Sequence, residues 1–279
     1  MDGNVKAGGG ATSAGPGAAP AAESVTEELR TRAGGADLYA HAAWERDCPG
    51  LACGITAAGS GADFGLTTSP DAWTLIGGIT ALGEALDVPG VAMVRQVHDC
   101  RVMRVGSVPP GALLVAGDAD GLVTVERGVL LAVTAADCVP VYLLDPGTGT
   151  LGLLHAGWRG AAAGVLEAGV AALEREAGVP PGRVRVHLGP AICGDCYEVG
   201  PEVLRAFGRE AEGPAKLDLR RELAARAAEA GVEPGAIGAS TWCTRCGADR
   251  FHSHRGSGGT AGRMAAYLGW RASGCPESG

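Results

Sequence analysis

The chain has 279 residues, of which 46% are apolar and 19% charged, enough for one large domain or two small ones. Its formal net charge of −8 argues against a general role in binding nucleic acids or membrane surfaces. The sequence has no apolar stretch approaching the roughly 20 residues of a membrane-spanning helix, and its N-terminus lacks the charged-then-apolar order of a signal peptide. We therefore expect a cytoplasmic protein.

Nine cysteines are spread from Cys48 to Cys275. Their number is odd, and the chain is large enough to fold without disulfide bonds. We therefore expect reduced thiols in a reducing compartment.

The chain begins with residues 1–35, which are rich in Ala, Gly and Pro and show no hydrophobic periodicity. This composition is typical of a disordered extension. Residues 36–272 are expected to form one catalytic domain. Ser69-Pro70 is a typical helix start, and an apolar face is expected on the helix that follows, from Trp73, Ile76, Ile79, Leu82 and Leu86.

Short apolar runs alternate with helical segments through the rest of the chain. The runs typical of strands are Cys53–Thr56, Val91–Val97, Leu122–Val125, Val129–Val133, Val141–Leu144, Leu151–Leu154 and Val184–Leu188. Helices are expected over Ala161–Ala177, Glu202–Arg209 and Leu219–Ala230. The strand–turn–helix–strand order from Leu151 to Leu188 has the form of a βαβ crossover. The pattern predicts an α/β protein, a single domain with helices packed against a mixed sheet.

His98, Cys138 and His155 each stand near the end of a strand-like run. Taken singly, such a cysteine is usually a small buried hydrophobe, and such a histidine is usually a structural residue. Proteins of the α/β class place ligands at strand ends, however. Two imidazoles and one thiolate are also what a catalytic zinc needs, with a fourth position left for water or substrate. Asp137 and Arg159 add charged groups beside this candidate site, and Asp137 could carry a proton in catalysis or orient a metal ligand.

Two C-x-x-C pairs offer a rival metal site: Cys193 with Cys196, and Cys243 with Cys246. Four thiolates could form a structural zinc site, although the 46 residues between the pairs exceed the usual spacing. They could also be redox-active or inert thiols, and the inert interpretation is favoured.

Three arginines, Arg159, Arg255 and Arg263, are candidates for holding phosphate, because a guanidinium binds two oxygens at once. The alternative for each is a solvated surface arginine. The glycine-rich stretch from Gly256 to Gly262 could let backbone amides approach an anion, or it could be a flexible loop.

Several motifs stand in the order found in one known family. They are Gln96-Val-His98, Asp118-Ala-Asp120-Gly-Leu-Val-Thr124, Thr134-Ala-Ala-Asp-Cys138-Val-Pro140, His155-Ala-Gly-Trp-Arg-Gly160, Gly189-Pro-Ala-Ile192, Cys196-Tyr-Glu-Val199, Cys243-Thr-x-Cys246, and Phe251-x-Ser-x-Arg255 with Gly262-Arg263. From about Gly54 to Trp270 the chain resembles the laccase-domain proteins of bacteria and animals. These have been named polyphenol oxidase, peptidoglycan editing factor and purine nucleoside phosphorylase.

The resemblance implies an α/β/α fold with a mixed sheet, similar to cysteine-hydrolase-like toxin domains. It implies a metal site formed by His98, Cys138 and His155. A soft thiolate with imidazoles suits zinc or copper, and zinc is favoured because it needs no redox partner. The implied activity is phosphorolysis of adenosine, inosine and 5′-methylthioadenosine, together with deamination of adenosine. The implied partners are therefore purine nucleosides and phosphate, with no nucleic acid and no membrane.

The chain departs from the family pattern in two places. The family usually has an arginine after the Gly-Ile-Thr strand, where this chain has Ala57, and a second arginine after Arg255, where it has Gly256. Part of the substrate-holding shell is thus altered. True laccases bind four coppers through repeated His-x-His pairs. This chain has six histidines and one such pair, His252-Ser-His254, so it cannot assemble that centre.

Two other functions remain open at the level of sequence. The first is a cysteine hydrolase with Cys138 as nucleophile and His155 as base, acting on peptidoglycan precursors or amides. The second is a non-enzymatic interaction protein stabilised by zinc on the two C-x-x-C pairs.

Overall fold

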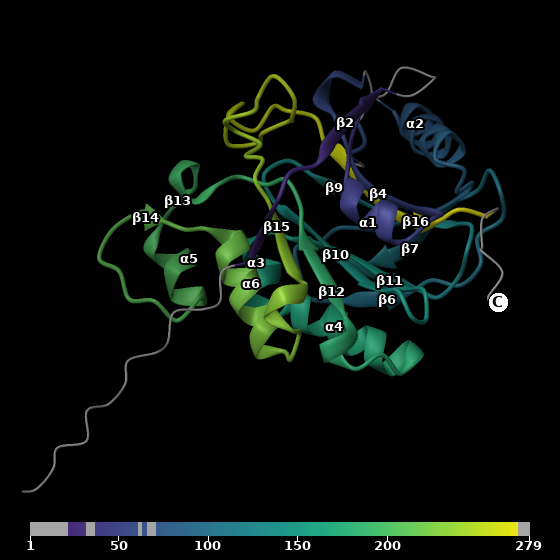
Figure 1. The fold of residues 1–279 in the computed structure, drawn as a ribbon. Coiled ribbons are helices and arrows are strands. Elements are labelled where there is room, and N and C mark those ends of the chain that lie inside the picture. Colours follow the sequence, from purple (N-terminus) through teal and green to yellow (C-terminus); the bar gives the residue numbers. More distant parts are fainter. Residues whose placement is uncertain (1–21, 32–36, 61–62, 66–70, 273–279) are drawn as a thin grey trace, which may run out of the picture.

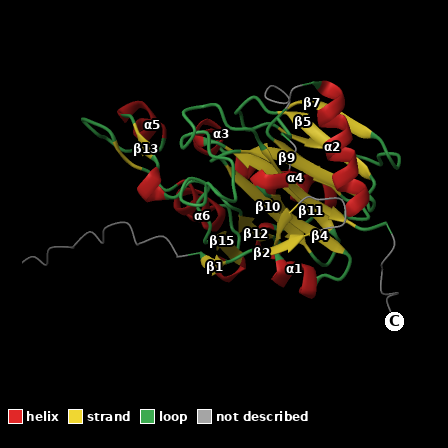
Figure 2. Cartoon of the chain, turned by 90° about the horizontal axis from the view of Figure 1, so that it is seen from above, coloured by secondary structure: helices red, strands yellow, loops and turns green. Residues whose placement is uncertain are grey.

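The computed structural model describes residues 22–31, 37–60, 63–65 and 71–272. Two seven-stranded sheets pack face to face, and helices cover both outer faces (Figures 1 and 2). The predicted mixed α/β class is confirmed. The strands form two mixed sheets where one was expected, and the likeness to cysteine-hydrolase toxin domains stays a prediction.

The first sheet is built around β10, which pairs antiparallel with β11 on one side and with β12 on the other. Its order is β1 (Glu23–Val25), β15 (Ile237–Ser240), β12 (Arg185–Leu188), β10 (Val139–Asp145), β11 (Thr150–Ala156), β8 (Gly121–Thr124) and β6 (Val102–Arg104). The predicted crossover therefore links two strands that run parallel to each other but are separated by β10.

The second sheet has β16 and β9 near its centre. Its order is β2 (Glu28–Thr31), β3 (Asp37–Ala40), β4 (Leu51–Thr56), β16 (Met264–Trp270), β9 (Val129–Ala135), β5 (Gly90–Arg95) and β7 (Leu113–Asp118). A small separate two-stranded sheet pairs β13 (Glu198–Val199) with β14 (Ala215–Lys216) in antiparallel fashion. Because β9 belongs to one sheet and β10 to the other, the turn Ala136–Cys138 carries the chain between the sheets.

Helices cover the outer faces of the two sheets. The α-helices are α1 (Ala42–Asp47), α2 (Ala72–Ala85), α3 (Trp158–Ala163), α4 (Val165–Ala177), α5 (Pro201–Ala206) and α6 (Leu219–Glu229); 3₁₀ turns are η1 (Ala58–Ser60), η2 (Pro181–Arg183), η3 (Gly194–Cys196) and η4 (Pro234–Ala236). Helices α4 and α6 pack on the first sheet, and α2 packs on β5 and β7 of the second. The apolar core accordingly has three layers, one between the sheets and one under the helices on each side.

Two helix predictions need correction. The segment expected to be one helix over Ala161–Ala177 is split into α3 and α4 at Gly164, whose φ of 93° lies in the left-handed region that ends a helix. The predicted apolar face of α2 was wrong in its first turn, because Trp73 and Ile76 are 82% and 37% exposed, and Leu75 is buried there instead. Helix α2 is capped by Asp71, and the predicted start at Ser69-Pro70 lies outside the described residues.

The predicted disordered extension was too long at its C-terminal end. Within residues 1–35, the structure forms β1 and β2, while residues 1–21 lie outside the described part. Composition missed these strands because β1 is held by backbone pairing with β15, and β2 by pairing with β3. Glu27, buried between them, accepts a hydrogen bond from the Ser240 hydroxyl (2.6 Å). No helix in the described ranges is both long and apolar enough to cross a bilayer.

Candidate metal centre

His98, Cys138 and His155 come together where the ends of both sheets meet. His98 follows β5, Cys138 lies in the turn between β9 and β10, and His155 lies near the end of β11. Their potential ligand atoms all lie within 4.8 Å of one another. His155 is buried, Cys138 is partly buried and His98 is exposed. The group therefore has one open side.

The orientation of His155 is fixed by Asp120, a carboxylate with no exposed surface. His155 Nδ1 lies 2.8 Å from Asp120 Oδ1, which leaves Nε2 as the nitrogen that can bind a metal. Burial lowers the pKa of His155, but the Cys138 thiolate and the Asp120 carboxylate outweigh it and raise that pKa overall. Burial likewise raises the pKa of the Cys138 thiol, and the neighbouring imidazoles bring it below its usual value. The pair thus favours a thiolate, the form that binds metal.

His98 is held in an uncommon backbone conformation, with a φ of 63°. The backbone amides of the two residues that flank His98, Val97 (3.0 Å) and Asp99 (2.8 Å), donate to the second carboxylate oxygen of Asp120. Asp120 therefore orients both histidines at once. Gly157 packs closely against the site, because a β-carbon there would lie 3.1 Å from both Cys138 Sγ and His98 Cδ2.

Asp137 precedes Cys138 and also has a left-handed φ, 84°. Its carboxylate accepts a hydrogen bond from the Thr244 hydroxyl (2.6 Å) and another from the Arg255 backbone amide (2.6 Å). Its carbonyl oxygen accepts from the Ile192 amide. These contacts favour a positioning role for Asp137 over the transfer of a proton.

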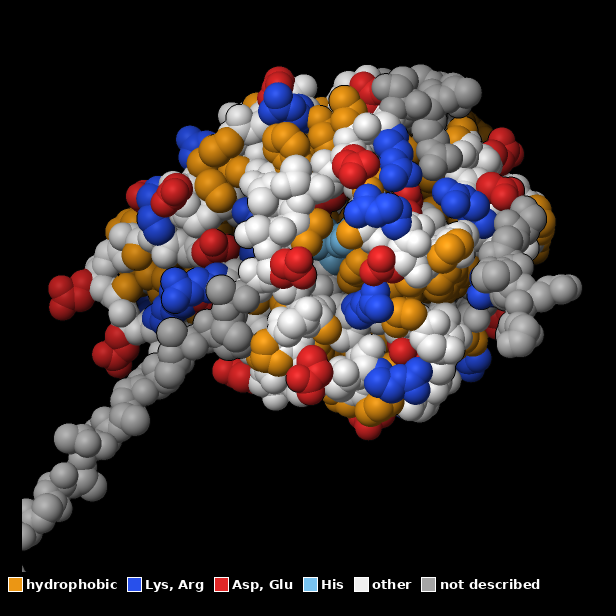
Figure 3. Space-filling view, viewed as in Figure 1, with side chains coloured by type: hydrophobic (Ala, Val, Ile, Leu, Met, Phe, Trp, Pro, Cys, Tyr) orange, Lys and Arg blue, Asp and Glu red, His pale blue; other side chains and the backbone are white. Residues whose placement is uncertain are grey.

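A cavity of about 340 Å³ opens above the three residues. It is within the range of small-molecule sites. Its wall is formed by Gly65, Arg95, Gln96, His98, Thr134, Ala136, Cys138, His155, His254 and Arg263. Figure 3 shows basic and acidic side chains interspersed over one face of the molecule. The cavity wall itself carries Arg95, Arg263 and three histidines, so an anionic or polar ligand would suit it.

The predicted substrate arginines lie in different places. Arg263 lines the cavity, with its guanidinium donating to the carbonyl oxygen of Ala261 (2.7 Å). Among the described residues that form the wall, Arg159 and Arg255 do not occur. The Arg159 guanidinium lies over the Trp158 ring (4.3 Å). That of Arg255 lies over the Tyr197 ring and donates to the carbonyl oxygen of Glu198.

Sequence reasoning missed Asp120, Gln96 and Arg95. In the sequence Asp120 stood out only as part of a family motif, although an Asp-x-Asp-Gly segment near a candidate histidine could have suggested a carboxylate partner. Gln96 links two strands of the cavity wall, since its side chain bonds the backbone of Thr134 in both directions. Arg95 forms a two-pronged ion pair with Asp118, which fixes its guanidinium at the rim.

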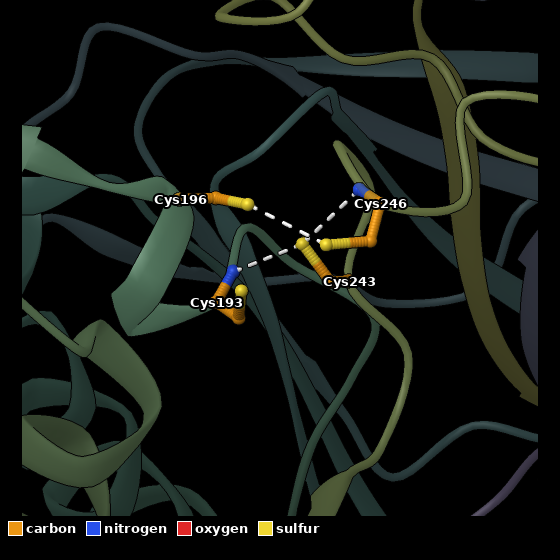
Figure 4. Close-up of side chains that lie close together, drawn as sticks. All are labelled: Cys193, Cys196, Cys243 and Cys246. Atoms are coloured by element: carbon orange, nitrogen blue, oxygen red, sulfur yellow. Dashed lines mark hydrogen bonds between the residues drawn. The ribbon is translucent and has the colours of Figure 1, made fainter.

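The two C-x-x-C pairs also converge, at a separate place (Figure 4). The sulfurs of Cys193, Cys196, Cys243 and Cys246 all lie within 4.8 Å of one another. The four thiols thus have the geometry of the rival metal site, although the sequence favoured inert thiols, and they form a group separate from the first.

Comparison with known proteins follows from this geometry. A family model described as "Multi-copper polyphenol oxidoreductase laccase" matches residues 60–271. Adenosine deaminase RL5, from an unknown prokaryotic organism, is 35% identical over 201 residues, covering 66% of this chain and 76% of that protein. Purine nucleoside phosphorylase YlmD of Geobacillus stearothermophilus is 35% identical over 229 residues, covering 75% and 83%.

Solved structures agree. The crystal structure of YlmD from Geobacillus stearothermophilus superposes with a TM-score of 0.78 at 30% identity, covering 88% of this chain and 99% of that one. The Bacillus licheniformis hypothetical protein YfiH gives a TM-score of 0.76 at 27% identity, covering 87% and 98%. The chain therefore belongs to the laccase-like polyphenol oxidoreductase family.

Proposed function

We propose that this chain is a zinc-dependent purine nucleoside enzyme. In this proposal it cleaves adenosine, inosine and 5′-methylthioadenosine with phosphate and also deaminates adenosine. The observation that carries the proposal is the meeting of His98, Cys138 and His155 at the base of a cavity large enough for a small molecule. The names of two relatives, a purine nucleoside phosphorylase and an adenosine deaminase, support the substrate class.

The donor set fits a zinc ion. A thiolate with two imidazoles suits zinc, with copper as the alternative. The Asp120–His155 contact is the carboxylate–histidine arrangement that orients metal-binding imidazoles. Three protein ligands would leave a fourth position for water or substrate, and all three residues line the cavity. A bound zinc would supply Lewis acidity, which can lower the pKa of a water molecule to about 7 and polarise a phosphate oxygen.

The residues of the chain would perform the remaining tasks. Arg263, on the cavity wall, is the guanidinium best placed to hold phosphate or a purine. His254 adds a second nitrogen group to the same wall. Asp137 would keep the Cys138 turn in position through Thr244 and Arg255.

The test is a product analysis with purified protein. Adenosine, inosine and 5′-methylthioadenosine are each incubated with and without phosphate, and the bases, sugar phosphates and inosine are resolved. We expect free base only with phosphate, and inosine from adenosine in both conditions. Cys138→Ala should lose activity by more than the roughly 100-fold that loss of an outer hydrogen-bond partner costs, whereas Cys48→Ala, a buried thiol at the end of α1, should retain it. No product from any nucleoside, or full activity in Cys138→Ala, would refute the proposal.

One observation favours a second candidate, a cysteine hydrolase. The Cys138 thiolate lies beside the His155 imidazole, which Asp120 in turn orients. This is the arrangement of an activated nucleophile. Such an enzyme should hydrolyse amides after chelation, and a thiol reagent should label Cys138 without metal removal. Loss of all activity on chelation would exclude it.

A further inference from the structure

The two loops that carry the C-x-x-C pairs bring four thiols to one point. After β12, Cys193 precedes the η3 turn and Cys196 is its last residue, and Cys243 and Cys246 follow β15. Figure 4 shows the four side chains directed toward a common centre from two separate loops. We propose that these four cysteines bind a second zinc ion, which is structural and distinct from the candidate centre at His98, Cys138 and His155.

The sulfur spacing suits a metal better than a disulfide. Four ligands at the usual zinc–sulfur distance of about 2.3 Å lie about 3.8 Å from one another, and the four sulfurs lie within 4.8 Å of one another. The Cys196 and Cys246 sulfurs are 3.4 Å apart, whereas a disulfide needs about 2.05 Å. All four are free thiols.

Backbone amides prepare one sulfur to carry charge. The amide of Cys193 donates to Cys243 Sγ (3.3 Å), and that of Cys246 donates to the same sulfur (3.4 Å). A neutral thiol is a weak acceptor, whereas hydrogen bonds to an ionised acceptor are roughly twice as strong. Two donors on one sulfur therefore favour a thiolate. Arg245, between the two ligands of its own loop, donates to the carbonyl oxygen of Cys196 and adds a positive charge beside the cluster.

The ligand set also separates the two sites by role. Four soft thiolates select zinc over harder cations such as magnesium and calcium. They fill the tetrahedral coordination of zinc and leave no position for water or substrate, which is the mark of a structural site. The first group supplies three ligands and opens onto a cavity.

The position of the cluster indicates which part of the protein a bound zinc ion would stabilise. Cys243 forms an isolated parallel β-bridge with Ala191, which precedes the loop that carries Cys193 and Cys196. The Thr244 amide donates to the carbonyl oxygen of Ala191. Thr244 then donates through its hydroxyl to Asp137, the residue before Cys138. A zinc ion joining the two loops would fix Thr244 and, through it, the turn that carries Cys138.

Zinc content of the full-length protein tests the inference. We expect about two zinc ions per chain, falling to about one in Cys246→Ala and to about one in Cys138→Ala, with no loss in the control Cys48→Ala. The double variant Cys138→Ala/Cys246→Ala should hold none. One zinc ion in the parent protein that Cys138→Ala removes and Cys246→Ala retains would overturn the inference.

A spectroscopic measurement keeps the test decisive if Cys246→Ala fails to fold. Cys138→Ala protein loaded with cobalt in place of zinc should show the intense sulfur-to-cobalt charge-transfer bands of a tetrahedral all-thiolate site. Absence of a bound ion in this variant would overturn the inference. So would mass spectrometry without reductant showing the loss of two hydrogens per cysteine pair, because it would identify disulfide-forming redox pairs.

Discussion

Replacing Asp120 by asparagine should weaken zinc binding by changing which nitrogen of His155 carries the proton. One oxygen of Asp120 accepts two backbone amides, and the other faces His155 Nδ1. Asparagine has one oxygen, which must stay with the two amides, so its NH₂ group would face His155. The imidazole would then accept at Nδ1 and carry its proton on Nε2, the nitrogen needed for the metal.

The expected loss follows from this change. Outer hydrogen-bond partners of metal-binding histidines are worth about 10–100-fold in affinity, which corresponds to about 1.4–2.7 kcal/mol. The affinity for zinc at this site is measured by competition with a chelator of known affinity. The ion bound there is identified as the one that is lost in Cys138→Ala. Nitrogen NMR of the imidazole reports the tautomer independently, and a merely structural effect would leave that signal unchanged.

The control is Asp118→Asn, two residues away. Asp118 is a partly exposed carboxylate paired with Arg95. Its replacement should change the zinc affinity of the parent protein by no more than about two-fold, which corresponds to about 0.4 kcal/mol. Equal losses in the two variants, or unchanged affinity in a folded Asp120→Asn protein, would refute the reasoning.

Three further predictions concern single positions. Gly157→Ala should reduce zinc content, measured after dialysis, because the added methyl would lie 3.1 Å from Cys138 Sγ; retention of full zinc would contradict this. The pKa of His41 is lowered from 6.5 to about 3, mainly by burial and next by the charge of a neighbouring histidine. As the pH falls, the unfolded chain therefore binds this proton before the folded chain does. The stability that neutral His41 contributes is complete above pH 6.5 and is lost as the pH falls toward 3, by about 2 kcal/mol at pH 5. In urea unfolding at pH 7 and 5, His41→Asn should show a smaller pH dependence, and an unchanged one would refute the assignment. In α2, Gly77→Ala, which meets nothing within 4 Å, should stabilise by about 0.5–1 kcal/mol, whereas Gly83→Ala, 2.8 Å from a valine methyl, should lower the melting temperature; the same sign for both would be inconsistent with this packing.

The strands were predictable, but their arrangement was not. Strands buried on both faces read as continuous apolar runs, as in Val129–Ala135 and Val139–Asp145. The existence of two sheets depends on pairings such as β16 with both β4 and β9, whose partners are more than 100 residues apart in the chain. Local periodicity carries no information about such pairings. The same limit explains β1, which is held by a strand about 200 residues later.

The candidate metal ligands were identified from their places at strand ends and from the family resemblance. Their supports were not, because each lies far along the chain. Asp120 stands 35 residues before His155, and Thr244 stands 107 residues after Asp137. An aspartate before glycine is also a common turn signal, so its pattern gave no reason to expect burial. The sequence pattern therefore identified the candidate metal ligands, whereas the residues that orient them became visible only in the fold.

Backbone strain at the site shows how the supports and the ligands depend on each other. His98 and Asp137 both have left-handed φ values, and such residues cost of order 1–3 kcal/mol unless their surroundings fix them. Each is fixed by a buried carboxylate: Asp120 binds the amides around His98, and the side chain of Asp137 is bound by Thr244 and a backbone amide. Because the strained turns are held by the protein itself, the ligands should be positioned before any metal arrives. The ordering entropy is then supplied by folding, and zinc affinity should be sensitive to these two carboxylates although neither is a ligand.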